Sequence, residues 1–379
     1  MESMRVLIVR NAYSYDFGGA ERLAVELGAE LVSNSIGVTI ASRQPRLLKY
    51  ARERKVPSLR GWWWSRQNWS GTNQLLLPFY GIWLILLFMW YVTLLLKKHP
   101  DALHLMSKDD FIAGTLAGRL FGRRVVWTDC ADLKYLYRNN DIWYKNPIGK
   151  TVYRISKLAH AVIVVSNSEK KLIETALGHK TPSNYIVIYS TVCDMPVKPF
   201  THKKNVGDVI FCSTSRLVEA KGIQDLISAF TAVSRQNKTC KLWIVGDGPD
   251  EAKFKKSASN NNSVTFWGHQ DAPLPLLAAA DVYVHPSHHE GFSLSLAEAA
   301  MLGKPLIATK TGGNPEIVND SNGLLFEVQN IDELILAIQI LAQDATLRKR
   351  LGNKARKDFQ SLFDFRHVVK DQYVSLYEK

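Results

Sequence analysis

The feature that most constrains the fold of this chain is the alternation of short β-branched runs with longer helical stretches from one end to the other. Such alternation predicts parallel sheets covered by helices on both faces, because parallel strands need long crossover connections. The runs form two series of six, and we expect each series to form one sheet. The first series is 5–9, 38–41, 102–106, 125–128, 161–165 and 185–189, and the second is 209–213, 241–245, 264–267, 282–285, 306–309 and 324–326.

The spacing predicts an α/β chain of two Rossmann-like, doubly wound domains that face each other across a cleft. We expect an N-terminal domain over residues 1–190, a linker over 191–207 that carries Pro196 and Pro199, and a C-terminal domain over 208–360. Residues 361–379 are expected to form a C-terminal helix that can cross back to the first domain. Doubly wound sheets bind ligands at the carboxyl ends of their strands, so functional residues are sought in the loops that follow strands.

Composition excludes several other classes of protein. At 379 residues and 46% hydrophobic content, the chain is long enough for two domains with their own cores. The four cysteines are scattered and form no C-x-x-C pair, which argues against a zinc cluster or a disulfide framework and favours a reducing cytoplasm. The first ten residues run into an apolar strand, so no cleavable signal peptide is expected.

The net charge of +13 is concentrated in the first half of the chain. Residues 1–190 contain 26 Lys and Arg against 14 Asp and Glu, or +12, and the remainder contains 22 against 21, or +1. Within the segment from Arg43 to Arg66, eight basic residues accompany Glu53 and the run Trp62 to Trp64. Basic residues beside tryptophans favour an anionic membrane surface, and no recognised motif accompanies the charge to favour nucleic acid.

Leu75 to Leu96 is a run of 22 uncharged residues, long enough to span a membrane. Because the run lies between the second and third strands of the first sheet, a spanning helix would divide that sheet between two sides of the bilayer. We therefore expect a helix that packs on the sheet and dips one face into the membrane surface. A fully buried helix and a spanning helix are the alternatives.

Two glycines, Gly18 and Gly19, follow the first strand and precede a helical stretch. Glycines at a helix N-terminus let backbone N–H groups approach an anion such as a phosphate. The dinucleotide fingerprint G-x-G-x-x-G is absent, so this is not a nicotinamide signal. A plain flexible turn is the alternative interpretation.

The first strand of the second series leads into Ser215 and Arg216, with Lys221 five residues after the arginine. Two cations at the end of a strand can hold a diphosphate from two sides, the guanidinium by bidentate bonds and the ammonium as a point charge. Solvated surface charges are the alternative. The turn at 246–248 is interpreted as structural.

Two carboxylates, Glu290 and Glu298, stand eight positions apart after the strand 282–285. Between them, 291–294 offers backbone amides at the start of a helix, again suited to an anion. Glu290 lies among strand-end loops and is suited to binding sugar hydroxyl groups or supporting positive charge on a substrate. Glu298 has a structural alternative, because Ser295 to Glu298 matches the capping-box pattern.

These residues resemble the retaining glycosyltransferases of family 4, which have the GT-B fold. Glu290 and Glu298 stand at the spacing of that family's E-x7-E motif. The resemblance also includes Gly312-Gly313 and further motifs, and it is dense from about Val209 to Leu351 but thinner in the first domain. The further motifs are Ser215-Arg216 with Lys221-Gly222, Gly246-Asp247-Gly248-Pro249, Pro315-Glu316, Asn322-Gly323-Leu324-Leu325, Gly18-Gly19 and Pro100-Asp101-Ala102-Leu103-His104.

The resemblance implies catalytic roles for Glu290, Arg216 and Lys221, with the two cations on the diphosphate of a UDP- or GDP-linked sugar. Glu298 is implied in binding the ribose. The resemblance implies no metal and no further cofactor. Donor binding is implied for Gly18, Gly19, Ser215, Gly291, Phe292, Ser293, Leu294 and Glu298.

One position departs from the family pattern. Members often carry a histidine after the fourth strand of the first domain, and here Cys130 occupies that place. A partly buried thiol without a role is the alternative for Cys130. Together with Asp16 and Asp129, it is assigned to acceptor binding.

Together with the sequence observations, the resemblance implies a metal-independent retaining glycosyltransferase, a hexosyltransferase, acting in polysaccharide or glycolipid biosynthesis. Its partners are a nucleotide sugar, a lipid-linked saccharide acceptor and the anionic membrane surface, with no nucleic acid. We expect a cytoplasmic, peripheral (monotopic) protein on the inner face of the cell membrane. A sugar-nucleotide hydrolase or epimerase on the same fold and a catalytically silent membrane scaffold are the alternatives.

Overall fold

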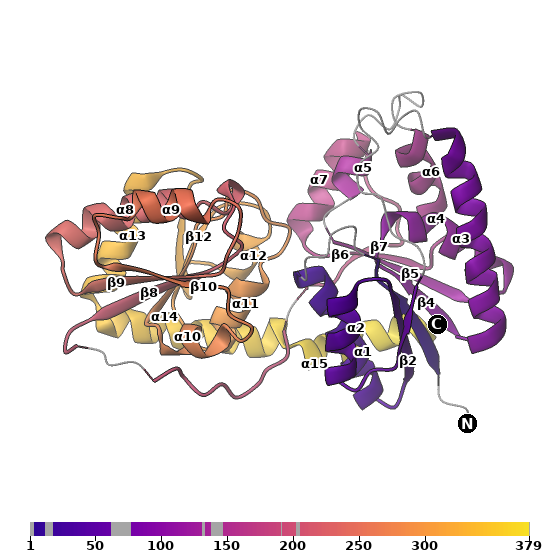
Figure 1. Cartoon of the computed structure of the whole chain (residues 1–379), viewed down its shortest axis with the longest axis horizontal. Coiled ribbons are helices and arrows are strands. Elements are labelled where there is room, and N and C mark those ends of the chain that lie inside the picture. Colours follow the sequence, from indigo (N-terminus) through magenta and orange to yellow (C-terminus); the bar gives the residue numbers. More distant parts are fainter. Residues whose placement is uncertain are drawn as a thin grey trace. The chain divides into compact units, whose positions relative to one another are not determined.

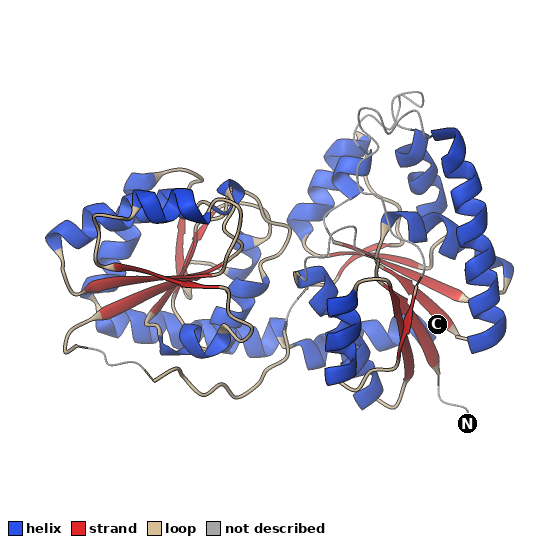
Figure 2. Ribbon diagram, viewed as in Figure 1, coloured by secondary structure: helices blue, strands red, loops and turns tan. Residues whose placement is uncertain are grey.

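The computed structural model describes residues 4–11, 18–61, 77–130, 133–137, 147–190, 192–201 and 205–378. The chain divides into two compact units, residues 1–190 with 366–379 (unit 1) and residues 191–365 (unit 2). In each unit, helices cover both faces of one sheet (Figures 1 and 2). Every pair of neighbouring strands in the two sheets is parallel.

Unit 1 is built on a sheet of seven strands in the order β3-β2-β1-β4-β5-β6-β7. Its strands are β1 (Arg5–Val9), β2 (Gly37–Ser42), β3 (Ser58–Arg60), β4 (Ala102–Leu105), β5 (Arg124–Asp129), β6 (Ala161–Val164) and β7 (Tyr185–Val187). Its helices are α1 (Gly19–Ser33), α2 (Pro45–Glu53), α3 (Leu77–Lys98), α4 (Lys108–Leu120), α5 (Leu133–Tyr137), α6 (Pro147–Ser156) and α7 (Asn167–Leu177).

Unit 2 is built on a sheet of six strands in the order β10-β9-β8-β11-β12-β13. Its strands are β8 (Val209–Thr214), β9 (Cys240–Val245), β10 (Val264–Gly268), β11 (Val282–His285), β12 (Leu306–Thr309) and β13 (Gly323–Phe326). Its helices are α8 (Ile223–Gln236), α9 (Glu251–Ser257), α10 (Leu274–Ala279), α11 (Leu294–Met301), α12 (Asn314–Ile317), α13 (Ile331–Gln343) and α14 (Ala345–Asp358).

The twelve predicted strands all appear, but the first sheet has a seventh, β3, that the sequence interpretation missed. β3 has only three residues and pairs with β2 at the sheet edge, so it carries neither the length nor the apolar alternation of a strand signal. The prediction of six strands in the first sheet is therefore wrong by one.

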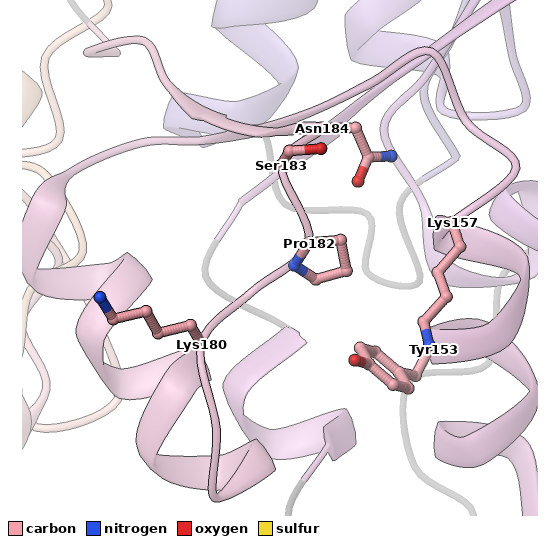
Figure 3. Close-up of a pocket in the computed structure, with 6 residues that line it drawn as sticks. All are labelled: Tyr153, Lys157, Lys180, Pro182, Ser183 and Asn184. Carbon is pink, nitrogen blue, oxygen red and sulfur yellow. The ribbon is translucent and has the colours of Figure 1, made fainter.

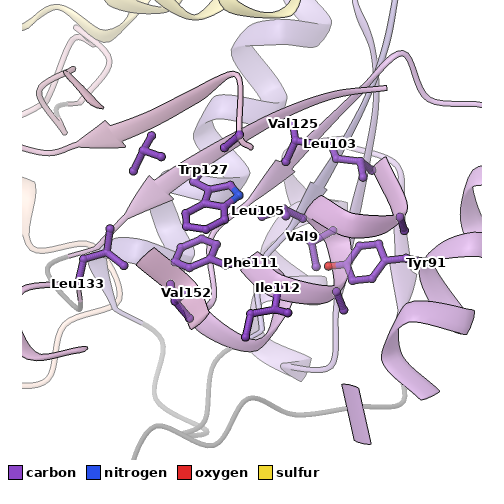
Figure 4. Packing of buried hydrophobic residues seen from close by; sticks show 14 of the residues in the cluster. Val9, Tyr91, Leu103, Leu105, Phe111, Ile112, Val125, Trp127, Leu133 and Val152 are labelled. Carbon is purple, nitrogen blue, oxygen red and sulfur yellow. The ribbon is translucent and has the colours of Figure 1, made fainter. Parts of the chain in front are cut away.

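The core of unit 1 lies between the sheet and the helices α3, α4, α5, α6 and α7 (Figure 4). Phe111 stacks on Trp127 with the ring centroids 4.3 Å apart, and the Trp127 indole N–H donates to Thr115. Unit 2 has a separate core around Phe211, Phe230 and the inner faces of β8 to β12. Each unit thus buries its own apolar surface, which is the main term favouring folding.

Helix α3 is the apolar run predicted from the sequence. By length and composition it could cross a membrane, and it is the one such helix among the described residues. One side is buried in the core of unit 1 through Leu87, Tyr91 and Leu95, and the Tyr91 hydroxyl donates to Asp110. The other side exposes an apolar stripe, which consists of Phe79, Ile82, Ile85, Leu86, Met89 and Leu96.

The last residues of the chain pack on unit 1. They form α15 (Phe365–Val368), a π-helical turn (Val369–Tyr373) and α16 (Val374–Glu378). The Tyr377 hydroxyl lies 2.5 Å from Nδ1 of the fully buried His104, and the backbone oxygen of Leu376 accepts from the Arg124 guanidinium. These contacts place the end of the chain against β4 and β5, the strands that carry His104 and Arg124.

Candidate active site

Strand order reverses at one place in each sheet, between β8 and β11 in unit 2 and between β1 and β4 in unit 1. At such a switch point, the loops after the two strands diverge and leave room for a ligand outside their carboxyl ends. In unit 2 these loops carry Ser215 and Arg216 after β8 and Glu290 after β11. The structure therefore brings three of the predicted site residues to one switch point.

Glu290 has two positively polarised partners. Its Oε1 lies 2.5 Å from Lys221 Nζ and 2.8 Å from His285 Nε2. The side chain of Glu290 is 11% exposed and that of Lys221 is 28% exposed, so the pair is largely screened from water. Lys221 closes a short 3₁₀ turn (Glu219–Lys221), which places the ammonium group over the β11 loop.

The environment of Glu290 fixes its protonation state. Burial alone would raise the pKa of this carboxyl, but the hydrogen bonds and charges of His285 and Lys221 outweigh burial and lower the pKa to about 2. Glu290 is therefore ionised at neutral pH. A carboxylate that stays charged can accept hydroxyl groups and can stabilise a developing positive charge.

His285 is a site residue that sequence interpretation missed. It is the last residue of β11, it is 2% exposed, and Tyr283 stacks beside it with ring centroids 6.3 Å apart. Its Nδ1 is buried without a hydrogen-bond partner among the described residues. The sequence signal for this residue was a polar side chain at the end of an otherwise apolar strand. The interpretation counted His285 as part of the strand and did not consider it as a site residue.

Two glycines allow the loops around Glu290 to pack closely. Gly222 has φ +64° and Gly312 has φ +52°, a region that favours glycine. A Cβ at Gly222 would lie 2.0 Å from the backbone oxygen of Pro286, and one at Gly312 would lie 1.7 Å from that of Glu290. The two glycines therefore allow the backbone to pack closely against the loop that carries Glu290. Gly222 does so at the start of α8, and Gly312 does so just before α12.

Helix α11 begins beside Glu290. Its N-cap is Ser293, whose hydroxyl accepts from the backbone N–H of Leu296, and Gly291 and Phe292 precede it. Glu298 is therefore at the fifth helical position and is 5% exposed, so the capping-box alternative for Glu298 is wrong. Burial raises the pKa of the nearby Tyr283, and the charge of Glu298 makes a small contribution in the same direction.

The β8 side of the switch point presents Ser215 and Arg216. Arg216 is exposed and Ser215 is half-buried. A Cβ at Gly246 would lie 2.0 Å from the backbone oxygen of Ser215, so the predicted structural turn after β9 packs directly against this loop. The structure thus holds the loop backbone in place beside the exposed residue Arg216.

In unit 1, Gly18 is the N-cap of α1 and Gly19 is its first residue, and both are exposed. The backbone N–H of Gly18 donates to Glu21 at 3.0 Å, and Glu21 is paired with the buried Arg10 at 2.7 Å. Arg10 also donates to the backbone oxygen of Met106 after β4. The Arg10–Glu21 pair, which sequence interpretation did not identify, therefore ties the start of α1 to the switch point of unit 1.

The residues predicted to bind the acceptor have different environments. Asp129 is 1% exposed and its Oδ1 accepts from the backbone N–H of Leu133, at the start of α5. Cys130 follows it, is half-buried and forms no disulfide. Asp16 lies outside the described residues, as do Trp62 to Trp64.

No group of three or more His, Cys, Asp or Glu side chains in the described part of the chain is placed to hold a metal ion. A cavity of about 510 Å³ is lined by Tyr153, Lys157, Lys180 and the loop 182–184 (Figure 3). It lies before β7, at the amino-terminal edge of the unit 1 sheet, whereas the predicted site residues follow the carboxyl ends of strands.

Each of the two units matches a known protein family. Residues 17–192 match the family described as Glycosyltransferase Family 4, and residues 194–358 match Glycosyl transferases group 1. The chain is a family 4 glycosyltransferase. The predicted family is thereby confirmed, and this glycosyltransferase is matched over both of its units.

Two relatives illustrate the range of similar proteins. An uncharacterized glycosyltransferase of Methanocaldococcus jannaschii is 26% identical, over 72% of this chain and 74% of the relative. A GDP-mannose-dependent monoacylated alpha-(1-6)-phosphatidylinositol monomannoside mannosyltransferase of Corynebacterium glutamicum is 34% identical, over 55% of this chain and 59% of the relative. The chain thus spans less than two thirds of the second relative's length.

Among solved structures, the glycosyltransferase is similar to Anabaena Alr3699/HepE in complex with UDP and glucose. The TM-score is 0.75 and the sequence identity 19%, over 99% of this chain and all of that one. This similarity confirms the predicted fold class, the GT-B type with two doubly wound domains.

Proposed function

We propose that this glycosyltransferase transfers a sugar, with retention and without a metal, from a nucleotide diphosphate sugar to a lipid-linked saccharide. The product belongs to polysaccharide or glycolipid biosynthesis. The observation that carries the proposal is the ionised Glu290, which is held by Lys221 and His285 at the switch point where Arg216 also lies.

The donor diphosphate is assigned to Arg216 and Lys221. Lys221 gives one of its three N–H donors to Glu290 and has the others for phosphate oxygens. The backbone amides of 291–294 add the partial positive charge of the α11 N-terminus. Glu298 is assigned to the ribose hydroxyls. Ser215, Gly18 and Gly19 are also assigned to donor binding.

The reaction that this arrangement supports needs no external base. The bond between the anomeric carbon and the phosphate oxygen breaks, and negative charge gathers on the diphosphate beside Arg216 and Lys221. The acceptor hydroxyl attacks the oxocarbenium-like carbon on the face that the diphosphate leaves, and its proton passes to that phosphate. Glu290 accepts both of its bonds on Oε1, so Oε2 is assigned to a hydroxyl of the donor sugar.

The relatives support both substrates. The name of the Corynebacterium glutamicum protein specifies GDP-mannose as donor and a phosphatidylinositol mannoside as acceptor, and the Anabaena structure holds UDP and glucose. A nucleotide sugar and a lipid-borne acceptor are the features that we carry over. A donor screen with UDP- and GDP-sugars identifies the nucleobase and the sugar.

Association with the inner face of the cell membrane is the second part of the proposal. The charge of +12 on residues 1–190 would attract anionic headgroups, and the exposed apolar stripe of α3 would enter the interface. Polar replacement of Trp62 to Trp64 is expected to weaken sedimentation of the protein with anionic vesicles. Sedimentation equal to that of the wild-type protein would remove the tryptophans from the membrane assignment.

The central test is Glu290→Gln, measured as nucleotide release from a panel of UDP- and GDP-sugars with a polyprenyl-linked saccharide acceptor. We expect kcat/KM to fall about 100- to 1,000-fold, the range for the loss of one group that stabilises transition-state charge. The matched control is Glu219→Gln, an exposed carboxylate that pairs with Lys253, and it should keep wild-type activity.

The product distinguishes the other functions that the fold allows. Nucleotide release without an acceptor-linked sugar would identify a hydrolase or an epimerase. Absence of turnover on the whole panel, with donor binding unaffected by Glu290→Gln, would identify a scaffold and contradict the proposal.

A further inference from the structure

Unit 1 contains a hollow of about 410 Å³ that three arginines surround, which we call the arginine pocket. Arg43 follows β2, Arg52 lies on α2 and Arg60 ends β3. Pro45, Leu48 and Leu59 form its apolar wall. The volume is within the range of roughly 300–1,000 Å³ that is typical of sites for small ligands.

The arginine pocket concentrates positive charge. No acidic side chain lines it, and Arg52 and Arg60 form no ion pair with any carboxylate in the part of the chain that the structure describes. The two nearby carboxylates are directed to other cations, Glu26 to Arg54 and Glu53 to Lys49. Like charges at close range repel, so an anion in the pocket would relieve an unfavourable arrangement.

Two hydrogen bonds show where the pocket lies in unit 1. The backbone N–H of Arg43 donates to Oδ1 of Asn11 at 3.2 Å, and Asn11 is the second residue after β1. The N–H of Gly61, after β3, donates to the backbone oxygen of Ser42. The pocket therefore lies at the carboxyl ends of β2 and β3, next to the strand that leads to Gly18.

The chemistry of the lining selects one class of ligand. Guanidinium groups bind phosphate oxygens in pairs, and the apolar wall is suited to a hydrocarbon chain, which free phosphate and nucleotides lack. We propose that the arginine pocket binds the phosphate group that joins the acceptor saccharide to its lipid carrier. This inference rests on the proposed function, because it assumes that the acceptor is lipid-linked.

The test uses farnesyl phosphate as the probe, with UDP and GDP present in excess so that any nucleotide site is occupied. The variant Arg52→Gln/Arg60→Gln is expected to bind farnesyl phosphate at least about tenfold more weakly than the wild-type protein, because it lacks two charge-assisted contacts. Farnesol, which has no phosphate, should bind all proteins equally. Arg46→Gln/Lys49→Gln removes the same charge from exposed positions of α2 outside the pocket and should bind as the wild type does.

Each other outcome overturns the assignment. Equal affinity in all three proteins, or no binding by the wild type, would show that the pocket is not a phosphate site. Equal losses in both double variants would show a general charge effect. If Arg52→Gln/Arg60→Gln instead sedimented less with phosphatidylglycerol vesicles than the control variant, while farnesyl phosphate binding stayed unchanged, the arginines would serve bulk lipid. Sugar transfer is not measured, so failure here leaves the proposed function standing, and failure of the Glu290 test leaves this binding result interpretable.

Discussion

The two sheets differ in whether the charged side chains near the carboxyl ends of their strands have partners of opposite charge. In unit 2, the largely screened Glu290 is paired with Lys221 and His285, and close-packed glycines fix its loop. In unit 1, Arg52 and Arg60 line an open hollow without carboxylate partners in the described chain. A preorganised site is suited to a compact group of fixed shape, such as a sugar diphosphate, whereas an open cationic hollow is suited to an amphiphile.

The first prediction breaks the rigidity of unit 2. Gly312→Ala would place a Cβ against the backbone of Glu290, which must then move. Displacement of about 1 Å costs roughly 100-fold in rate, so we expect kcat/KM to fall at least about 100-fold. The strained φ lowers the stability of the folded state by about 1 kcal/mol and does not itself change the rate. The measurement is steady-state transfer with the best donor of the panel.

Gly268→Ala is the matched control for that change. Gly268 has φ +65° in the same unit, but a Cβ there would meet nothing within 4 Å. This variant should lose stability by about 1 kcal/mol and keep its activity. Equal activity losses in the two variants would show that φ strain, and not contact with Glu290, matters.

The second prediction separates the two sides of α3 in unit 1. Leu87 is fully buried, so Leu87→Ala should lower the free energy of unfolding by about 3 kcal/mol. Ile85, 63% exposed, should change it by less than about 0.5 kcal/mol when replaced by Ala. Denaturant unfolding provides the measurement. A large loss at Ile85 would mean that the apolar stripe is part of the core and is not available to a membrane.

The third prediction compares the two units in acid. Burial lowers the pKa of His104 to about 3, against about 6.5 in the unfolded chain. Above pH 6.5 the imidazole is neutral in both states, and as the pH falls only the unfolded state gains the proton. Stability should therefore drop by about 2 kcal/mol between pH 6.5 and 5.

Glu290 has the opposite window, because its pKa of about 2 lies below the unfolded value. Its contribution is present above pH 4.5 and is lost only as the pH falls towards 2. Unfolding measured at pH 7 and 5 should thus report His104, and His104→Gln should reduce the difference. The exposed His269 provides a control, and a pH dependence that His104→Gln leaves unchanged would contradict the assignment.

Much of the fold could be predicted from the sequence, because the regular alternation of strand and helix segments indicates parallel sheets. β3 did not, since three residues at a sheet edge carry no periodic signal. At the site, Glu290 and Lys221 were both identified, but their mutual contact was not, because it depends on how far the 3₁₀ turn reaches over the β11 loop.

Two other features show a different limit of sequence interpretation. His285 was hidden within a strand whose other residues are apolar. Arg43 and Arg60 were interpreted as membrane-facing charges because they belong to a basic segment beside tryptophans. They are 17 positions apart in sequence, and only the pairing of β2 with β3 brings them around one hollow. Pockets formed between neighbouring strands are therefore less visible in sequence than motifs within one loop.

The packing of residues 366–379 on unit 1 has a consequence for biosynthesis. A ribosome completes the first 190 residues long before the segment that covers His104 has been made, whereas unit 2 is contiguous. At a synthesis rate of roughly 5–20 residues per second, unit 1 waits on the order of ten seconds or more for its last piece. The half of the enzyme that is translated first is thus the half that finishes folding last.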